Sequence, residues 1–415
     1  MHGRRVVVTG IGVISPLGNC QKDTWKAVKE GRSGIAEIEA FDTSEYTVRI
    51  AGEVKNFDAS DYGSKRDLRR LDRFSLFAIA AAEEALDEAG LDAESVDPKK
   101  VGTYVGTGIG GLHEIEAQHT RLMERGPRRT SPLMIPKLMT NAAAGQISIK
   151  YGFLGPSMSV SSACASGSNA IGEAFHSIRD GMVETAVCGG SEAAITPMGL
   201  SGFCQLKALS TRNEDPPKAS RPFEKNRDGF VMGEGAGILI LEALDFARAR
   251  GAEILGEVVG YGASSDASHI TLPDPEGKGA AEAMRNALED AEMAPEEIDY
   301  INAHGTGTPA GDDIECKAIM DVFGEHADQL PASSSKSMFG HLLGASGAVE
   351  GAICLDAIRE NICPPTINLD ELDPECGDLD LVPHEAEERP VRAVMNNSFG
   401  FGGHNVSLIF GQFDD

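Results

Sequence analysis

The sequence predicts an α/β fold in which helices cover a mostly parallel sheet. Apolar, strand-like runs alternate along the chain with helical patterns, and this alternation is typical of such folds. With 415 residues, of which 41% are hydrophobic and 24% charged, the chain is long and apolar enough to bury a large core. A weak internal sequence repeat further indicates that one structural unit occurs twice.

The predicted strands are short apolar runs, and the clearest predicted helix lies between the first two of them. This helix covers residues 72–88, which form an Ala- and Glu-rich helical pattern that ends before Gly90. The strand-like runs, in chain order, are 5–13, 101–106, 157–162, 185–188, 238–241, 254–260, 300–303, 332–334, 391–395 and 406–410.

The internal repeat consists of a Ser-rich strand followed by a helical pattern, which occurs twice in the chain. Cys164 precedes the pattern at 165–178, and His341 precedes the pattern at 347–359, with a Gly-Ala-Ser-Gly lead-in at 344–347. We therefore expect two related halves, residues 1–252 and 253–415. No linker rich in Pro or Ser divides them, so we expect them to pack as one body.

Charge and cysteine content exclude several classes of protein. The net charge of −27, from 37 basic and 64 acidic residues, disfavours binding to nucleic acid or to anionic lipid. No apolar run reaches the roughly 18 residues of a membrane helix. The eight cysteines form no CxxC pair and no Cys/His cluster with zinc spacing, so we expect no metal. Scattered thiols and the absence of a signal peptide favour the cytoplasm.

Cys164 is the strongest candidate for a functional residue. An apolar run ends just before it and a helical run of small residues, 166–178, begins just after it. A nucleophile at such a strand-to-helix turn faces the substrate, and the start of the helix favours a thiolate. A buried core cysteine explains this segment equally well.

Three further segments carry residues with catalytic potential. They are the His304 segment 302–309, the Lys336 and His341 segment 335–344, and the Gly-rich segment 397–405. Taken singly, each is explained as well by a polar loop, a solvated Lys with a capping His, or core Phe residues. Together with Cys164 they supply a nucleophile, proton donors and backbone N–H groups for an oxyanion. A dinucleotide loop at 106–111 is rejected because the usual downstream acidic residue is missing.

With these segments in hand, the chain closely resembles the β-ketoacyl-acyl carrier protein synthases, the condensing enzymes of fatty acid synthesis, with the elongating type II enzymes as the nearest match. The resemblance extends from 6–12 to 408–410 and includes the motifs 209–213, 220–223, 227–231 and 364–369. It implies a thiolase-like fold, in which two pseudo-repeated αβαβα halves form a five-layered body. It also implies a cytoplasmic homodimer with acyl carrier protein as partner and with no cofactor.

The resemblance also implies roles for individual residues. Cys164 matches the nucleophile, His304 and His341 match the two active-site histidines, and Lys336 matches a lysine paired with Glu350. Asp312 and Glu315 match supporting acidic positions, and Phe401 matches a gating residue whose N–H, with that of Cys164, forms the oxyanion hole. Further implied positions are Thr271, Thr306 and Thr308 for pantetheine, Ile109, Met134, Ala194, Phe203 and Phe401 for the acyl pocket, and Lys65, Arg66, Arg69, Arg70, Arg128, Arg129 and Lys207 for carrier docking.

The implied reaction is a decarboxylative Claisen condensation of an acyl thioester on Cys164 with malonyl-acyl carrier protein, which gives a 3-oxoacyl product. A type III synthase is excluded because it has Asn in place of His341. A thiolase is excluded because it needs a second catalytic Cys near the C-terminus. A polyketide-type ketosynthase and a non-catalytic chain-length partner subunit stay open. Thr306 and Thr308 could instead stabilise their loop, and for the basic residues we favour carrier docking over a solvated face.

Overall fold

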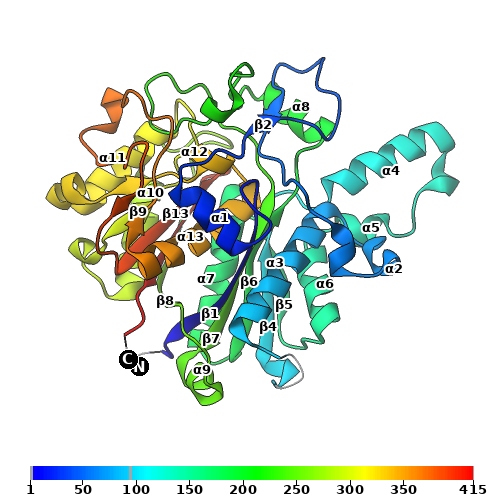
Figure 1. The fold of residues 1–415 in the computed structure, drawn as a ribbon, viewed down its shortest axis with the longest axis horizontal. Helices are drawn as coiled ribbons and strands as arrows, with labels where there is room; N and C mark the ends of the chain where they lie inside the picture. The colour runs from blue at the N-terminus through cyan, green and yellow to red at the C-terminus, as the bar shows by residue number, and fades with distance from the viewer. Residues whose placement is uncertain (1–2, 93–95, 415) are drawn as a thin grey trace.

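The computed structural model describes residues 3–92 and 96–414, and one ten-stranded mixed sheet runs through them (Figure 1). All ten predicted strands belong to this sheet. In their order across it, the strands are β10 (Ala332–Ser333), β9 (Tyr300–Asn302), β13 (Ala393–Gly400), β14 (His404–Gly411), β8 (Gly256–Ser265), β1 (Val6–Ile14), β7 (Gly235–Ala243), β6 (Thr185–Glu192), β4 (Val101–Gly106) and β5 (Ser157–Val160).

The sheet consists of two halves with the same strand order. From the centre outwards, β1, β7, β6, β4 and β5 form one half, and β8, β14, β13, β9 and β10 form the other. The halves are joined where residues 6–8 of β1 pair with residues 256–258 of β8. The predicted repeat is thus confirmed, whereas the division at 252/253, between the last helix of the first half and β8, stays a prediction.

The expected mostly parallel sheet is wrong. In each half only the outer strands are parallel, namely β4 with β5 and β6, and β9 with β10 and β13. The inner pairs are antiparallel. One reason is the short turn between β13 and β14, which forces a hairpin. Hydrophobic runs locate strands but carry no information on their direction.

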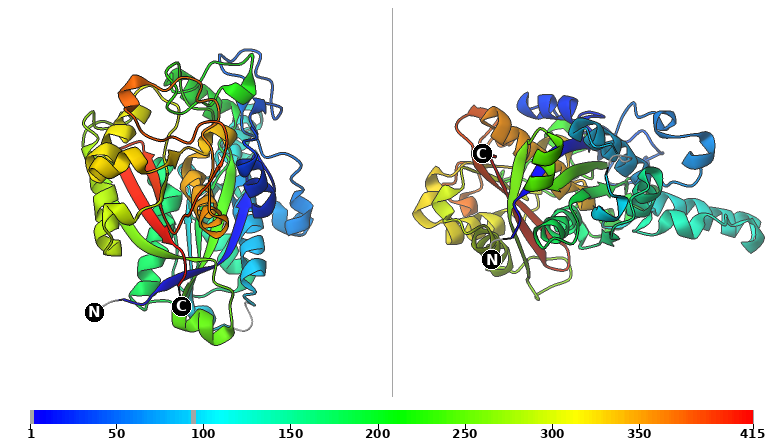
Figure 2. Two further views of the ribbon diagram at one scale, coloured as in Figure 1. Left: turned by 60° about the vertical axis from the view of Figure 1, so that its left-hand side comes forward. Right: turned by 90° about the horizontal axis from the view of Figure 1, so that it is seen from below.

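Two helices lie between the two halves of the sheet, and several others cover its outer faces (Figure 2). The central helices α7 (Ser166–Arg179) and α13 (Ser346–Glu360) contact strands of both halves. Outside, α3 (Arg73–Ala89) covers the first half, and α10 (Lys278–Ala291) and α11 (Asp312–Phe323) cover the second. The predicted helix at 72–88 is confirmed as α3. A Cβ on Gly12 of β1 would lie 1.9 Å from the Ala81 carbonyl oxygen, so this glycine lets α3 rest directly on the strand.

Two of the remaining helices build an arm. Helix α4 (Leu112–Arg125) projects from the body and returns through α5 (Met134–Leu138) (Figure 1). The other elements are α1 (Gln21–Lys29), α2 (Lys65–Leu68), α6 (Ala142–Tyr151), α8 (Pro197–Gln205), α9 (Leu244–Arg250), α12 (Lys336–Phe339), β2 (Ala36–Glu37), β3 (Ile50–Ala51), β11 (Ile362–Cys363) and β12 (Glu387–Glu388).

Among the described residues, no helix has the length and apolar content needed to cross a membrane.

Candidate active site

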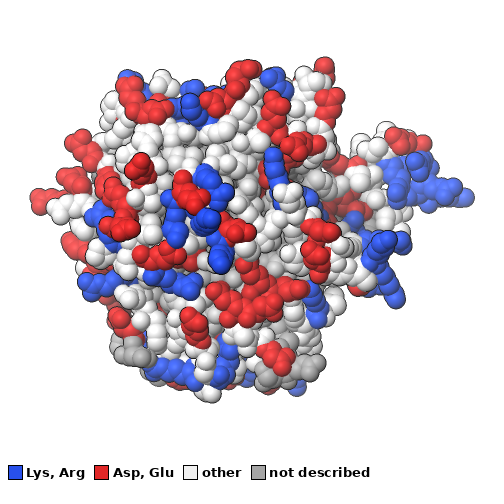
Figure 3. All heavy atoms as spheres, viewed as in Figure 1, with Lys and Arg blue, Asp and Glu red and all other residues white. Residues whose placement is uncertain are grey.

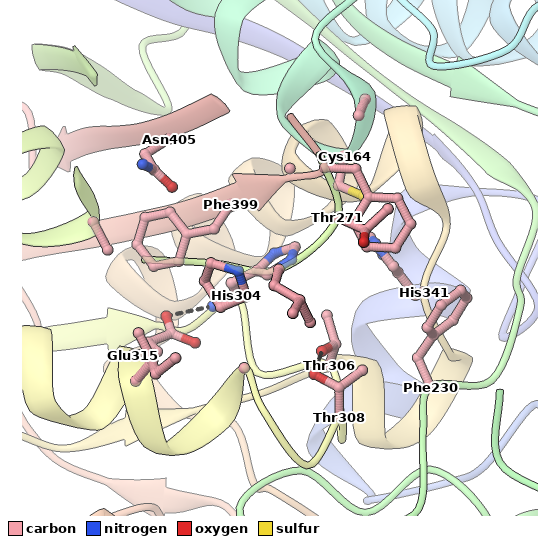
Figure 4. A pocket seen from close by; sticks show the side chains of 18 of the residues that line it. Cys164, Phe230, Thr271, His304, Thr306, Thr308, Glu315, His341, Phe399 and Asn405 are labelled. Carbon is pink, nitrogen blue, oxygen red and sulfur yellow. Dashed lines mark hydrogen bonds between the residues drawn. The ribbon is translucent and has the colours of Figure 1, made fainter. Parts of the chain in front are cut away.

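The two central helices begin at one cavity of about 240 Å3, and each is preceded by the same tight turn (Figure 4). Cys164 lies in the turn Ala163–Ala165 ahead of α7, and the turn Leu343–Ala345 precedes α13 just after His341. Ala163 and Leu343 both have φ near +50°, a left-handed conformation that is costly for residues with a side chain. The repeat therefore brings the Cys164 and His341 segments together from opposite halves.

Cys164 is buried, and its surroundings differ from the sequence expectation. Burial raises the pKa of the thiol to about 11, although the N–H groups of Phe401 and Cys164 itself and the charge of Lys336 lower it. A helix start stabilises an anion by up to about 2 kcal/mol, whereas burial of a charge costs several kcal/mol. The resting form is thus a thiol, and a nearby group must accept its proton before attack.

His304 is held by its backbone. It follows β9, and a Glu315 carboxylate oxygen on α11 accepts the N–H of His304 at 2.8 Å, while the other accepts that of Gly305 at 2.7 Å. Asp312 accepts the N–H of Thr306 at 3.1 Å. Burial raises the pKa of Glu315 to about 7. These two supporting carboxylates therefore shape the His304 loop, and their contacts go to the backbone rather than to the imidazole.

His341 faces His304 with the ring planes nearly perpendicular and the centroids 5.3 Å apart. Its Nδ1 lies 2.9 Å from the hydroxyl of Ser346. Phe230 packs against the same ring, and Phe399 packs against His304. Burial, and then the charge of Lys336, hold the pKa of both histidines well below the usual range. Both imidazoles are thus neutral near pH 7.

Lys336 does not line the cavity. Its ammonium lies 2.5 Å from a Glu350 carboxylate oxygen, and both side chains are fully buried. The predicted pairing of these two residues thus occurs in the structure. Because the charge of Lys336 acts on Cys164, His304 and His341, this residue influences the site through electrostatics.

Glu192 is a functional residue that the sequence reasoning missed. This fully buried carboxylate at the end of β6 accepts the N–H of Gly108 at 2.7 Å, that of Gly344 at 3.1 Å and the hydroxyl of Thr107 at 2.9 Å. It therefore ties the loop after β4 to the turn after His341. Its signal in the sequence is a lone acidic residue in a strand of otherwise small and apolar residues.

Most of the predicted site residues line one cavity, but some do not. Met134 lies on α5 and is not among the residues that line this cavity, so its assignment to the acyl pocket stays a prediction. Ala194 does not line the cavity and lies in the buried apolar cluster that also contains Cys164. The predicted residues that do line the cavity are Cys164, His304, His341, Phe401, Ile109, Phe203, Thr271, Thr306, Thr308, Asp312 and Glu315.

Comparison with known proteins identifies the family. A family profile described as "Beta-ketoacyl synthase, N-terminal domain" matches residues 3–247, and its C-terminal counterpart matches residues 255–370. The chain belongs to the β-ketoacyl synthase family. The family resemblance read from the sequence motifs is thereby confirmed.

Relatives of this β-ketoacyl synthase match it over its whole length. The 3-oxoacyl-[acyl-carrier-protein] synthase 2 of Synechocystis sp. is 50% identical over 413 residues, which cover 100% of this chain and 99% of that protein. The enzyme of the same name from Vibrio harveyi is 50% identical over 412 residues, with 99% of each chain covered.

Solved structures confirm the thiolase-like fold expected for the synthase. The ishigamide ketosynthase/chain length factor superposes with a TM-score of 0.93 at 39% identity, over 99% of this chain and 100% of that one. A β-ketoacyl synthase from Burkholderia phymatum has the same TM-score at 37% identity, with the same coverage.

The predicted docking residues of the synthase are all exposed and form two clusters. Figure 3 shows basic side chains gathered over α2 and over the tip of the α4 arm, on one side of the molecule. We call Lys65, Arg66, Arg69 and Arg70 the α2 cluster, and Arg125, Arg128 and Arg129 the arm cluster. Lys207, just after α8, stands apart from both.

The raised pKa of Cys164 predicts how its reactivity depends on pH. Below the thiol pKa, the thiolate fraction grows about tenfold per pH unit. Alkylation of Cys164 by iodoacetamide should therefore accelerate continuously from pH 7 to pH 10, as measured by peptide mass spectrometry. A Cys164→Ala variant identifies the modified peptide. A rate that levels off near pH 7 would show that the thiolate already dominates there.

Proposed function

We propose that this synthase condenses an acyl thioester held on Cys164 with malonyl-acyl carrier protein, giving 3-oxoacyl-acyl carrier protein in fatty acid elongation. The observation that carries the proposal is the convergence of Cys164, His304 and His341 on one cavity. It is supported by full-length relatives, half identical to this chain, that are named 3-oxoacyl-[acyl-carrier-protein] synthase 2.

In the first step the sulfur of Cys164 attacks the thioester carbonyl. Its proton passes to the neutral imidazole of His304 and then to the departing pantetheine thiolate, which leaves as a thiol. The tetrahedral oxyanion accepts hydrogen bonds from the N–H groups of Phe401 and Cys164, which already act on the sulfur in the resting site. The product is an acyl-enzyme.

In the second step the malonyl thioester loses carbon dioxide. The electron pair of the broken C–C bond moves onto the thioester, and the enolate oxygen accepts hydrogen bonds from the imidazoles of His304 and His341. A neutral imidazole N–H suits this role because it donates a hydrogen bond to the developing negative charge and keeps its own proton. The enolate carbon attacks the acyl group, and the Cys164 sulfur leaves as a thiolate that then takes up a proton from solvent.

The walls of the cavity fit the two ends of the substrate. Thr306 and Thr308, with hydroxyl oxygens 3.0 Å apart, and Thr271 form a polar side for the pantetheine arm. Ile109 and Phe203 form an apolar side for the acyl chain, with Phe401 as the gate beside Cys164. These assignments are proposals from position and side-chain chemistry.

The alternatives are a polyketide-type ketosynthase and a non-catalytic chain-length partner. A type II polyketide ketosynthase, solved in complex with its acyl-carrier protein, is 33% identical, well below the relatives named synthase 2. The presence of Cys164 and both histidines in one cavity disfavours a non-catalytic role. We therefore favour fatty acid elongation.

We propose acyl carrier protein as the partner of the α2 and arm clusters. The molecule carries a net charge of −27, so an acidic partner is repelled by most of its surface and attracted only by local basic groups. Both clusters are exposed and lie on one side of the body (Figure 3). Lys207 offers a further positive charge near the α8 wall of the cavity.

A second copy of the chain is the partner that we propose for strand β5. This strand ends the sheet, so within the described residues one side of its backbone has no strand partner. Around it Met158, Ile149 and Leu154 are 43%, 75% and 66% exposed. Pairing of two β5 strands would satisfy the backbone groups and cover these side chains. We also propose a cytoplasmic location, since all eight cysteines are free thiols.

The proposed reaction predicts a covalent adduct. Wild-type protein mixed with acyl-carrier protein thioesters of graded chain length should gain the mass of one acyl group. The Cys164→Ala variant should show no such gain, and the Cys204→Ala variant should show the same gain as the wild type. His304→Ala and His341→Ala should lower condensation by about 100-fold or more, because each removes an oxyanion donor. Intact-mass spectrometry and product assays measure both. A wild type without adduct at any chain length would contradict the proposal.

Carrier docking predicts a selective effect on one substrate form. Reversing charge in the α2 cluster with Lys65→Glu and Arg66→Glu should raise KM for acyl-carrier protein about tenfold or more, because opposite charges steer the encounter. KM for an acyl-pantetheine without carrier should not change. Lys22→Glu and Lys26→Glu on α1 serve as the charge-matched control, and an equal loss in both variants would refute local docking.

The β5 interface predicts a change in assembly. Wild-type protein should sediment as a dimer, and Met158→Asp should shift it towards monomer, because a buried unpaired carboxylate is costly at such an interface. Ala294→Asp, which places the same charge on an exposed site of the second half, should remain dimeric. Analytical ultracentrifugation distinguishes these states, and a dimeric Met158→Asp would rule out this interface.

A further inference from the structure

The repeat places equivalent serines at the starts of the two central helices. Ser166 is the first residue of α7 and Ser346 the first residue of α13. Each hydroxyl oxygen accepts the backbone N–H of the residue four positions earlier, from Ser162 at 3.0 Å and from Leu342 at 2.9 Å. Both hydroxyls are fully buried, so each of their protons needs an acceptor within the protein.

The two serines differ in where that proton goes. Ser166 donates to the Ala163 carbonyl oxygen at 2.6 Å. Ser346 has a different neighbour, Nδ1 of His341 at 2.9 Å, and in the described part of the chain its hydroxyl makes no other hydrogen bond besides the one from the Leu342 N–H. If Nδ1 carried a proton, the Ser346 proton would have no acceptor, and a buried donor without an acceptor is costly. The hydroxyl therefore donates to Nδ1.

We infer that Ser346 is a positioning residue that fixes His341 as the tautomer with its proton on Nε2. A neutral imidazole carries one proton, and an Nδ1 that accepts a hydrogen bond leaves this proton on Nε2. His341 lines the cavity, so the tautomer offers an N–H to a bound oxygen atom. This inference rests on the proposed function, in which His341 donates to the enolate oxygen.

The low pKa of His341 supports this arrangement, since burial and Lys336 keep the ring neutral and thus able to exist as a single tautomer. His304 provides a contrast within the same site. Its Nδ1 is buried and has no hydrogen-bond partner among the described residues. The hydrogen bond from Ser346 thus selects one tautomer of His341, whereas no hydrogen bond to Nδ1 selects a tautomer of His304.

The direct test is the imidazole nitrogen NMR of protein labelled with 15N-histidine, with His341→Gln to assign the signals. The wild type should show a pyrrole-type Nε2 and a pyridine-type Nδ1 for His341. Ser346→Ala should move both shifts towards the average of two tautomers, and Ser346→Thr, which keeps the hydroxyl, should restore the wild-type pattern. A protonated Nδ1 in the wild type, or unchanged shifts in Ser346→Ala, would overturn the inference.

Kinetics of the same variants separate this role from a structural one. Ser346→Ala should slow malonyl decarboxylation about tenfold, as expected for partial loss of an oxyanion donor, while Cys164 is acylated within about twofold of the wild-type rate. Equal loss in both steps would indicate mere structural damage. Because the NMR readout needs no turnover, a wild type with the Nε2–H pattern but no decarboxylation would refute the proposed function and leave the tautomer assignment intact.

Discussion

The site depends on the close backbone contact between the starts of the two central helices. A Cβ on Gly167 of α7 would lie 2.9 Å from the Gly344 carbonyl oxygen ahead of α13, and one on Gly344 would lie 2.3 Å from the Gly108 nitrogen. Such an approach buries N–H groups far from water, and they need an acceptor. Glu192 supplies it for Gly108 and Gly344. Without these glycines and this carboxylate, Cys164 and His341 would not meet in one cavity.

Burial decides the chemistry of the site as much as residue identity does. The same lack of water that raises the pKa of Cys164 lowers that of His304 and His341. The result is a set of neutral groups around one buried ion pair, Lys336 with Glu350. A neutral donor in a dry cavity acts on developing charge more strongly than it would in water. The cavity is therefore better prepared for charge that forms during reaction than for charge present at rest.

Sequence patterns predicted the strands, helix α3 and the catalytic segments because each depends on local periodicity or on a long motif. They failed where the answer depends on contacts between distant residues. The direction of β7 and β14 and the contacts of Glu192 depend on packing between segments that are distant in the sequence. The thiolate expectation failed for the same reason, since local sequence shows the helix start but not the burial of Cys164.

Strand β5 has a consequence beyond assembly, because it ends at Val160, four residues before Cys164. The nucleophile is therefore attached by a very short tether to the outermost strand of the sheet. Whatever neighbour pairs with that strand also restrains the strained turn at Ala163. In the dimer proposed above, assembly and catalysis would therefore be mechanically linked, and a molecule that binds between two β5 strands would inhibit the enzyme without entering the cavity.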